Sequence, residues 1–165
     1  MPDTARQQVT DAFVARVGLM GSCQSTPIYD RPFKPVGELP RAWVWDFEET
    51  YGVERFASGQ LVNELTIAVS VVFAYIDSDD TDQTCRRIGN GLLGELISIL
   101  MNVPGAEPVE QDGTLGGIAF DMTARESAIV EVADATQHLG AVNMLWGVKY
   151  MVNESDPYTL MGNCS

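Results

Sequence analysis

Hydrophobic and polar residues alternate almost without a break along residues 64–76. Successive side chains of a strand point to opposite faces, so this pattern predicts a strand with one core face and one wet face. The even positions are smaller or more polar, except at the far end. The core face would consist of the large residues Leu65, Ile67, Val69, Val71, Phe73 and Tyr75.

Three further stretches carry the same period of two. Residues 42–47 predict a short strand with Trp43, Trp45 and Phe47 on one face. Residues 115–132 predict a strand region, interrupted near residues 123–127, and residues 137–140 look like a turn. The last strand covers residues 142–152, with its core face formed by Val142, Met144, Trp146, Val148, Tyr150 and Val152.

Two segments show the longer period of a helix. The first would run from a cap at Thr4 to about Val17. The second has an apolar stripe of Ile88, Leu92, Leu96 and Ile99 or Leu100, and residues 102–105 stop it. Acidic residues 79–82 precede this helix, where carboxylates would accept hydrogen bonds from free backbone N–H groups and offset the helix dipole.

The segments between these elements lack a clear period. Residues 18–39 are punctuated by prolines and glycines and predict an extended arm. Residues 48–60 look like a polar loop, and residues 153–165 like a frayed tail. The order predicts an α+β fold: a mostly antiparallel sheet of four to five strands with two main helices packed on one face. Residues 1–152 would form this single domain, with residues 153–165 as a flexible tail.

The chain has 165 residues and a net charge of −13, from 23 acidic and 10 basic side chains. That balance argues against a protein that grips nucleic acid phosphates or an anionic membrane surface. Its uncharged runs are too short to span a bilayer, and the N-terminus lacks the apolar core of a signal peptide. The 3 cysteines are far apart, which favours a reduced, cytoplasmic setting.

Several motifs are candidates for a dinucleotide, calcium or zinc site. Residues 89–94 read G-x-G-x-x-G, but they lie inside the helix stripe and not in the turn after a strand, as a dinucleotide site requires. Close packing of the helix on the sheet is the favoured explanation. The acidic residues 77–82 fail the calcium-loop pattern at its glycine and glutamate positions. The only histidine, His138, has no partner for a zinc site.

Two interpretations stay open. Cys85 sits at a helix start beside Arg86 and Arg87, a setting that lowers a thiol pKa, although a half-buried helix cysteine is the default. Tyr51 and Phe56 lie in an otherwise polar segment, where they are either interface anchors or loosely packed. We therefore predict no catalytic residue, cofactor or metal, and name as candidate interface residues Tyr29, Phe33, Tyr51 and Phe56.

Most of the chain, from Thr4 to Val152, resembles the tail terminator or tail-completion (minor tail) proteins of long-tailed bacteriophages. The resemblance rests on the N-terminal helix, LPRAWVW at residues 39–45, NELTIAVSVVFAYI at 63–76, DDTDQTCRRIGNGLLGELI at 79–97 and the late strand AVNMLWGVKYMV at 141–152. These motifs are structural and carry no catalytic residue.

The resemblance implies a non-enzymatic virion protein, assembled in the host cytoplasm. It would form a ring, commonly a hexamer, that caps the tail tube, stops tube polymerisation and offers a surface for joining the head. Its partners would be further copies of itself, the tail tube protein and a neck or connector protein. DNA would pass through the lumen without specific binding, and an acidic surface would repel it. The candidate acidic residues are Asp77, Asp79, Asp80 and Asp82.

Three alternatives remain. A head–tail neck or head-completion protein of the same machine would share the ring geometry. A small cytoplasmic nucleotide-binding protein or enzyme would use the glycine run or Cys85. A binding module for a cellular partner is the third. We also expect the 18–39 arm to wrap a neighbouring subunit or the tube.

Overall fold

In the computed structural model, which describes residues 2–32, 37–76, 84–132 and 137–161, two helices and six strands form one α+β unit. The elements are α1 (Ala5–Val17), β1 (Ile28–Tyr29), β2 (Arg41–Arg55), β3 (Gln60–Ala74), α2 (Cys85–Met101), β4 (Asp121–Val132), β5 (Leu139–Asn153) and β6 (Asp156–Leu160). The strand order is β1-β2-β3-β5-β4, with β6 paired to β5. All pairs are antiparallel except β1 with β2, so the α+β class is confirmed, in a mixed sheet of six strands.

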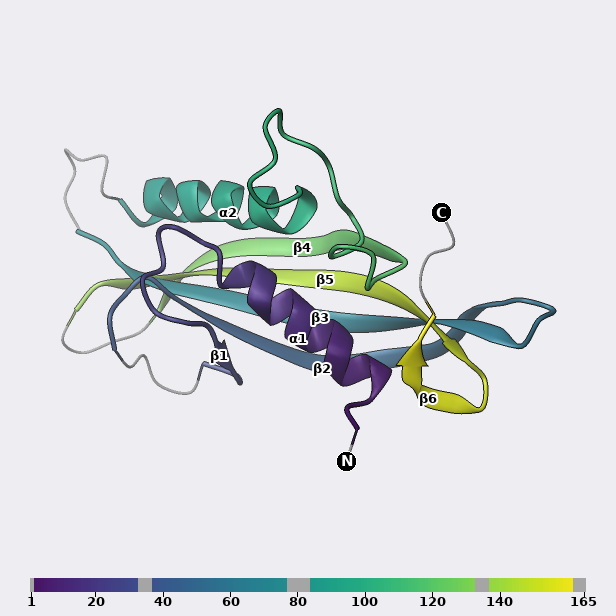
Figure 1. The fold of residues 1–165 in the computed structure, drawn as a ribbon. Helices are drawn as coiled ribbons and strands as arrows, with labels where there is room; N and C mark the ends of the chain where they lie inside the picture. Colours follow the sequence, from purple (N-terminus) through teal and green to yellow (C-terminus); the bar gives the residue numbers. More distant parts are fainter. Residues whose placement is uncertain (1, 33–36, 77–83, 133–136, 162–165) are drawn as a thin grey trace.

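One face of this sheet, the inner face, carries the main core. Both predicted core stripes, on β3 and β5, are buried there together with residues of α1 and α2. Figure 1 shows α1 lying obliquely across the strands and α2 running beside β4. The other face, the outer face, has a smaller buried cluster of Trp43, Val72 and Ala141, which the arm residues Ile28 and Leu39 cover in part.

The helices begin and end close to their predicted bounds. The Thr4 hydroxyl caps α1 by accepting a hydrogen bond from the Gln7 amide at 3.2 Å. The N-cap of α2 is Thr84, whose hydroxyl accepts a hydrogen bond from the Arg87 amide at 3.4 Å. The acidic residues 79–82, which were predicted to cap this helix, lie outside the described residues. A hydroxyl in the cap position supplies the acceptor that a carboxylate would have given.

The predicted polar loop at residues 48–60 is instead a hairpin. β2 continues to Arg55, and a tight turn closes with the Phe56 amide donating to the Gln60 carbonyl at 2.9 Å. Gly59 takes a φ of +83° in that turn, which suits glycine. Most side chains in the second half of β2 are exposed, so no hydrophobic alternation marks this half as a strand.

Three smaller predictions also need correction. The region 115–120 is a turn and not the start of a strand: Leu115, Gly116 and Gly117 all have positive φ, and β4 begins at Asp121. The predicted turn at 137–140 overlaps β5, which starts at Leu139. The tail predicted to fray contains β6, which pairs with β5. A short polar sequence gives no sign of this pairing.

Of the glycine run that was predicted to allow close packing, Gly89 in α2 has this role, whereas Gly91 and Gly94 do not. A Cβ built on Gly89 would lie 2.6 Å from Ile129 Cγ2 on β4, whereas one on Gly91 would meet nothing within 4 Å. We expect Gly89→Ala to destabilise the protein by about 1–3 kcal/mol, because a branched side chain next to its backbone cannot easily give way. The control Gly91→Ala should stabilise by about 1 kcal/mol through helix propensity. Urea denaturation measures both, and equal effects would contradict the packing role.

Candidate assembly surfaces

The end of the β2–β3 hairpin, residues 50–62, is here called the projecting hairpin. Figure 1 shows it reaching past β6 and the helices at one end of the molecule. Three of its apolar side chains are exposed: Tyr51 by 72%, Phe56 by 43% and Val53 by 39%. Apolar side chains gathered at a projecting end are typical of a contact with another molecule.

A bulge of three residues in β2 places Tyr51 outside the strand ladder. Thr50 pairs with Glu64 and Glu54 with Val62, so residues 51–53 face Asn63 alone. The buried Asn63 side chain accepts a hydrogen bond from the Gly52 amide at 2.9 Å and so replaces the missing ladder bond. Gly52 has a φ of +61°, which glycine adopts without strain. The bulge is therefore a built feature that presents Tyr51 to solvent.

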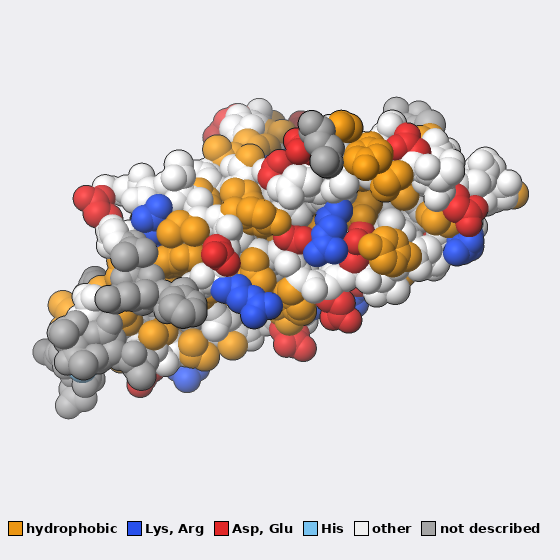
Figure 2. Space-filling view, turned by 90° about the horizontal axis from the view of Figure 1, so that it is seen from below, with side chains coloured by type: hydrophobic (Ala, Val, Ile, Leu, Met, Phe, Trp, Pro, Cys, Tyr) orange, Lys and Arg blue, Asp and Glu red, His pale blue; other side chains and the backbone are white. Residues whose placement is uncertain are grey.

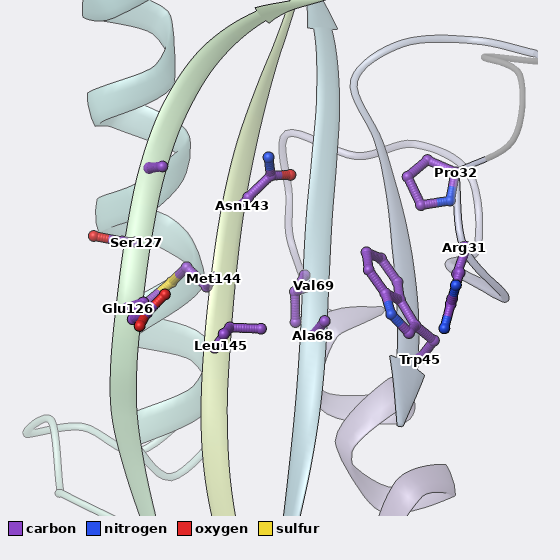
Figure 3. Close-up of a pocket in the computed structure, with 11 residues that line it drawn as sticks. Arg31, Pro32, Trp45, Ala68, Val69, Glu126, Ser127, Asn143, Met144 and Leu145 are labelled. Carbon is purple, nitrogen blue, oxygen red and sulfur yellow. The ribbon is translucent and has the colours of Figure 1, made fainter. Parts of the chain in front are cut away.

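The outer face carries a groove of about 480 Å³, here called the outer-face groove. Figure 3 looks onto it, with the helices behind the sheet and the arm at the Trp45 side. In the strand register Trp45 lies opposite Ala68 and Ala128 opposite Asn143, so these side chains share that face. Its lining comes from four strands and the arm: Arg31, Pro32, Trp45, Ala68, Val69, Glu126, Ser127, Ala128, Asn143, Met144 and Leu145.

The groove is mostly apolar at its floor and charged at its two sides. Ala68 and Leu145 lie on the central strands, and Trp45 stands beside them. Exposed Arg31 of the arm flanks one side and exposed Glu126 of β4 the other. The small residues Ala68 and Ala128 create the hollow. Ala68 falls at a position that the sequence pattern assigned to a wet face, whereas Ala128 shares the parity of the apolar residues Val130 and Val132. The alternation alone therefore does not place the two alanines on one face.

A polar network ties α1 to the sheet. Arg6 pairs with Asp46 at 2.5 Å and with Glu49 at 3.2 Å, and the Tyr29 hydroxyl donates to Asp46. The Tyr150 hydroxyl donates to Glu49, whose side chain is only 4% exposed. Burial, with the hydrogen bond to Asp46, raises the pKa of Tyr29 to about 12. Burial and Glu49 likewise raise the pKa of Tyr150, so both phenols are held as donors.

The structure does not gather the predicted interface residues at one place. Tyr51 and Phe56 share the projecting hairpin, whereas Tyr29 lies on β1 and contacts its own chain. Phe33 lies outside the described residues, as do the acidic candidates Asp77, Asp79, Asp80 and Asp82. The described parts of the arm lie against their own domain, for example where the Ser22 amide donates to Glu95 at 3.0 Å.

The structure locates three features that the sequence offered for chemistry: the glycine run, the groups that could bind a metal, and His138. The glycine run lies within α2, after its start at Cys85, and not in a strand-to-helix turn. Among the described residues, no three His, Cys, Asp or Glu side chains group closely enough to hold a metal ion. His138 stacks at a tilt on Tyr75, with ring centroids 5.5 Å apart.

Cys85 does not have the lowered pKa that its neighbours in the sequence indicate. Partial burial and Glu131 raise the pKa of its thiol, and Arg86 opposes them only in part. We expect iodoacetamide at pH 8 to modify Cys85 several-fold more slowly than a free cysteine peptide, because only the thiolate reacts. Peptide mapping distinguishes Cys85 from Cys23. Burial and the nearby Glu95 raise the pKa of the Cys23 thiol to about 11. A Cys85 rate above that of the free peptide would show an activated thiol.

The exposed charges are mixed on the side of the molecule that faces downward in Figure 1. Figure 2 shows small hydrophobic patches there, separated by basic (Lys or Arg) and by acidic side chains. Where acidic and basic groups alternate, no single-sign field dominates that side. Although the net charge is −13, the acidic side chains do not form one continuous patch on this side of the molecule.

No protein-family model matches the chain, and no curated protein matches it significantly. In the described part of the structure, no helix is long and apolar enough to cross a membrane. The projecting hairpin and the outer-face groove are the surfaces of this chain best suited to contact another molecule.

Proposed function

We propose that this chain is a structural assembly subunit that forms a ring on the tail tube of a long-tailed bacteriophage. The ring would stop tube polymerisation and provide the surface that joins the head. The phage assignment rests on the resemblance of the sequence pattern over residues 4–152. The observation that supports an assembly role is the projecting hairpin, which exposes Tyr51, Val53 and Phe56 at one end of the subunit.

The exposed apolar side chains of the hairpin favour association. The hairpin of this acidic protein exposes three apolar side chains. Covering them with a partner stabilises the complex by about 25 cal/mol per Å² of apolar area buried. Tyrosine is among the residues that dominate binding energy at interfaces. The acidic balance of the subunit would also keep a lumen from adhering to DNA phosphates as the genome passes.

Loss of the protein from the phage tests this function. We expect electron micrographs of particles made without it to show tails of irregular length, separate from filled heads. A neck protein of the same machine would instead leave tails of normal length that lack heads. Intact, infectious particles with joined heads and tails would contradict both roles.

Ring formation provides a second measurement. Sedimentation of the purified protein, alone and with tail tube protein, should show a closed oligomer in at least one condition. The alternative class, a small nucleotide-binding protein or enzyme, would give a monomer in both and a change in melting temperature with nucleotide. That outcome would contradict the proposed ring formation.

A further inference from the structure

We propose that the projecting hairpin of one copy inserts its aromatic side chains into the outer-face groove of the next copy. This contact deepens the proposed function, on which it rests, by naming the two surfaces that build the ring. Because the two surfaces differ, the contact is head-to-tail, and repeating such a contact generates a closed ring or an open filament.

The hairpin cannot reach the groove of its own chain. Gln60 at the hairpin end and Ala68 in the groove lie on the same strand, roughly 26 Å apart at about 3.3 Å per residue. β3 is paired along its length with β5, from Gln60 opposite Asn153 to Ala74 opposite Leu139. This continuous ladder keeps the strand from folding back, so a hairpin that enters the groove belongs to another copy of the chain.

The charges at the two surfaces are complementary. The groove has Arg31 on one side and Glu126 on the other, and the hairpin end carries Glu54 and Arg55. Within the subunit Glu54 lies 3.8 Å from Lys149, and Arg55 lies 3.2 Å from Glu154. Arg55 and Glu154 are both exposed and Lys149 is half-buried, and ion pairs near the surface contribute little to stability. Each surface therefore carries one basic and one acidic group, which can pair with the opposite charges of a second copy.

The side chains are also of the kinds that carry binding energy. Trp45 and Arg31 at the groove and Tyr51 on the hairpin belong to the residue types enriched in interface hot spots. The small floor residues Ala68 and Ala128 leave room for a ring to enter.

The test uses two variants of the full chain. The hairpin variant is Tyr51→Ser with Phe56→Ser, and the groove variant is Ala128→Glu, which fills the groove and adds charge. Val109, exposed by 71% in the segment between α2 and β4, gives the matched controls Val109→Ser and Val109→Glu. An unchanged urea midpoint for each variant shows that its fold is intact, because all these side chains are exposed.

Mass photometry, with and without tail tube protein, then measures assembly. We expect each variant alone to assemble about tenfold or more weakly than wild type, and the controls to match wild type. Mixing the hairpin and groove variants should give one-to-one pairs that grow no further, because each variant keeps one competent surface.

The other outcomes separate the two proposals. If wild type forms rings and both variants do too, the contact proposed here is wrong while the ring function stands. The same holds if the hairpin variant still forms rings but loses the tube, since the tube protein would then be the partner of the hairpin. If wild type stays monomeric in every condition, both proposals fail.

Discussion

Replacing Arg16 with methionine is expected to lower the free energy of unfolding by about 3–5 kcal/mol, the usual effect of breaking a buried ion pair. Arg16 is only 8% exposed, and its guanidinium lies 3.0 Å from the Asp112 carboxylate. It also donates to the Asn102 carbonyl, at the end of α2, at 2.9 Å. Methionine fills similar space but leaves Asp112 and that carbonyl without their donor.

The same substitution at Arg55 provides the control for this prediction. Arg55 pairs with Glu154 at 3.2 Å, but the two side chains are 65% and 62% exposed. We expect Arg55→Met to change stability by less than about 1 kcal/mol. Urea denaturation at pH 7 measures both variants, and an Arg16→Met effect as small as that of Arg55→Met would show that the buried pair does not hold α1 to α2.

Acid should reduce the Arg16 effect. Partial burial by itself raises the pKa of Asp112, but hydrogen bonds from the Thr114 hydroxyl and Arg16 outweigh it and hold the pKa well below its usual range. A carboxyl with a lowered folded pKa stabilises fully above its unfolded pKa of about 4 and loses that contribution as the pH falls below it. The difference between wild type and Arg16→Met should therefore shrink below pH ~4.

Truncating Phe13 to alanine is expected to remove about 3–5 kcal/mol of stability. The Phe13 side chain is fully buried, and its ring meets Trp146 of β5 edge to face, with centroids 6.3 Å apart and planes at 64°. This contact fixes α1 over the centre of the sheet, so the loss includes the transferred area, the cavity and the aromatic pairing.

Leu19, just beyond α1, is the matched surface position. Its side chain is 54% exposed, and we expect Leu19→Ala to change stability by less than about 0.5 kcal/mol. Thermal unfolding followed by circular dichroism compares the two variants. A Phe13→Ala loss below about 1 kcal/mol would mean that the sheet keeps its inner face covered without this ring.

The sequence predicted the parts of the fold that one chain segment decides. Strong alternation at residues 64–76 and 142–152 located β3 and β5, because one face of each strand lies against the core. The helix stripes located α1 and α2 for the same reason. The second half of β2 was missed because its side chains are mostly exposed, and a strand exposed on both faces has no hydrophobic period.

The candidate surfaces were only half predictable. Tyr51 and Phe56 stood out as aromatics in a polar segment, and the structure places both on one hairpin. The outer-face groove combines side chains from β2, β3, β5, β4 and the arm, far apart in sequence. Such a groove depends on strand order, and the placement of β5 between β3 and β4 is not encoded in any local pattern.

That placement of β5 also orders events during protein synthesis. The β2–β3 hairpin needs only residues up to Ala74, whereas the groove needs β5, which completes the ladders on both β3 and β4. A ribosome-bound chain that has emerged only through β4 can thus form a hairpin but no groove. Under the proposed contact, such a nascent chain offers a hairpin but no groove, so it would accept no further copy until the late strand β5 has been made.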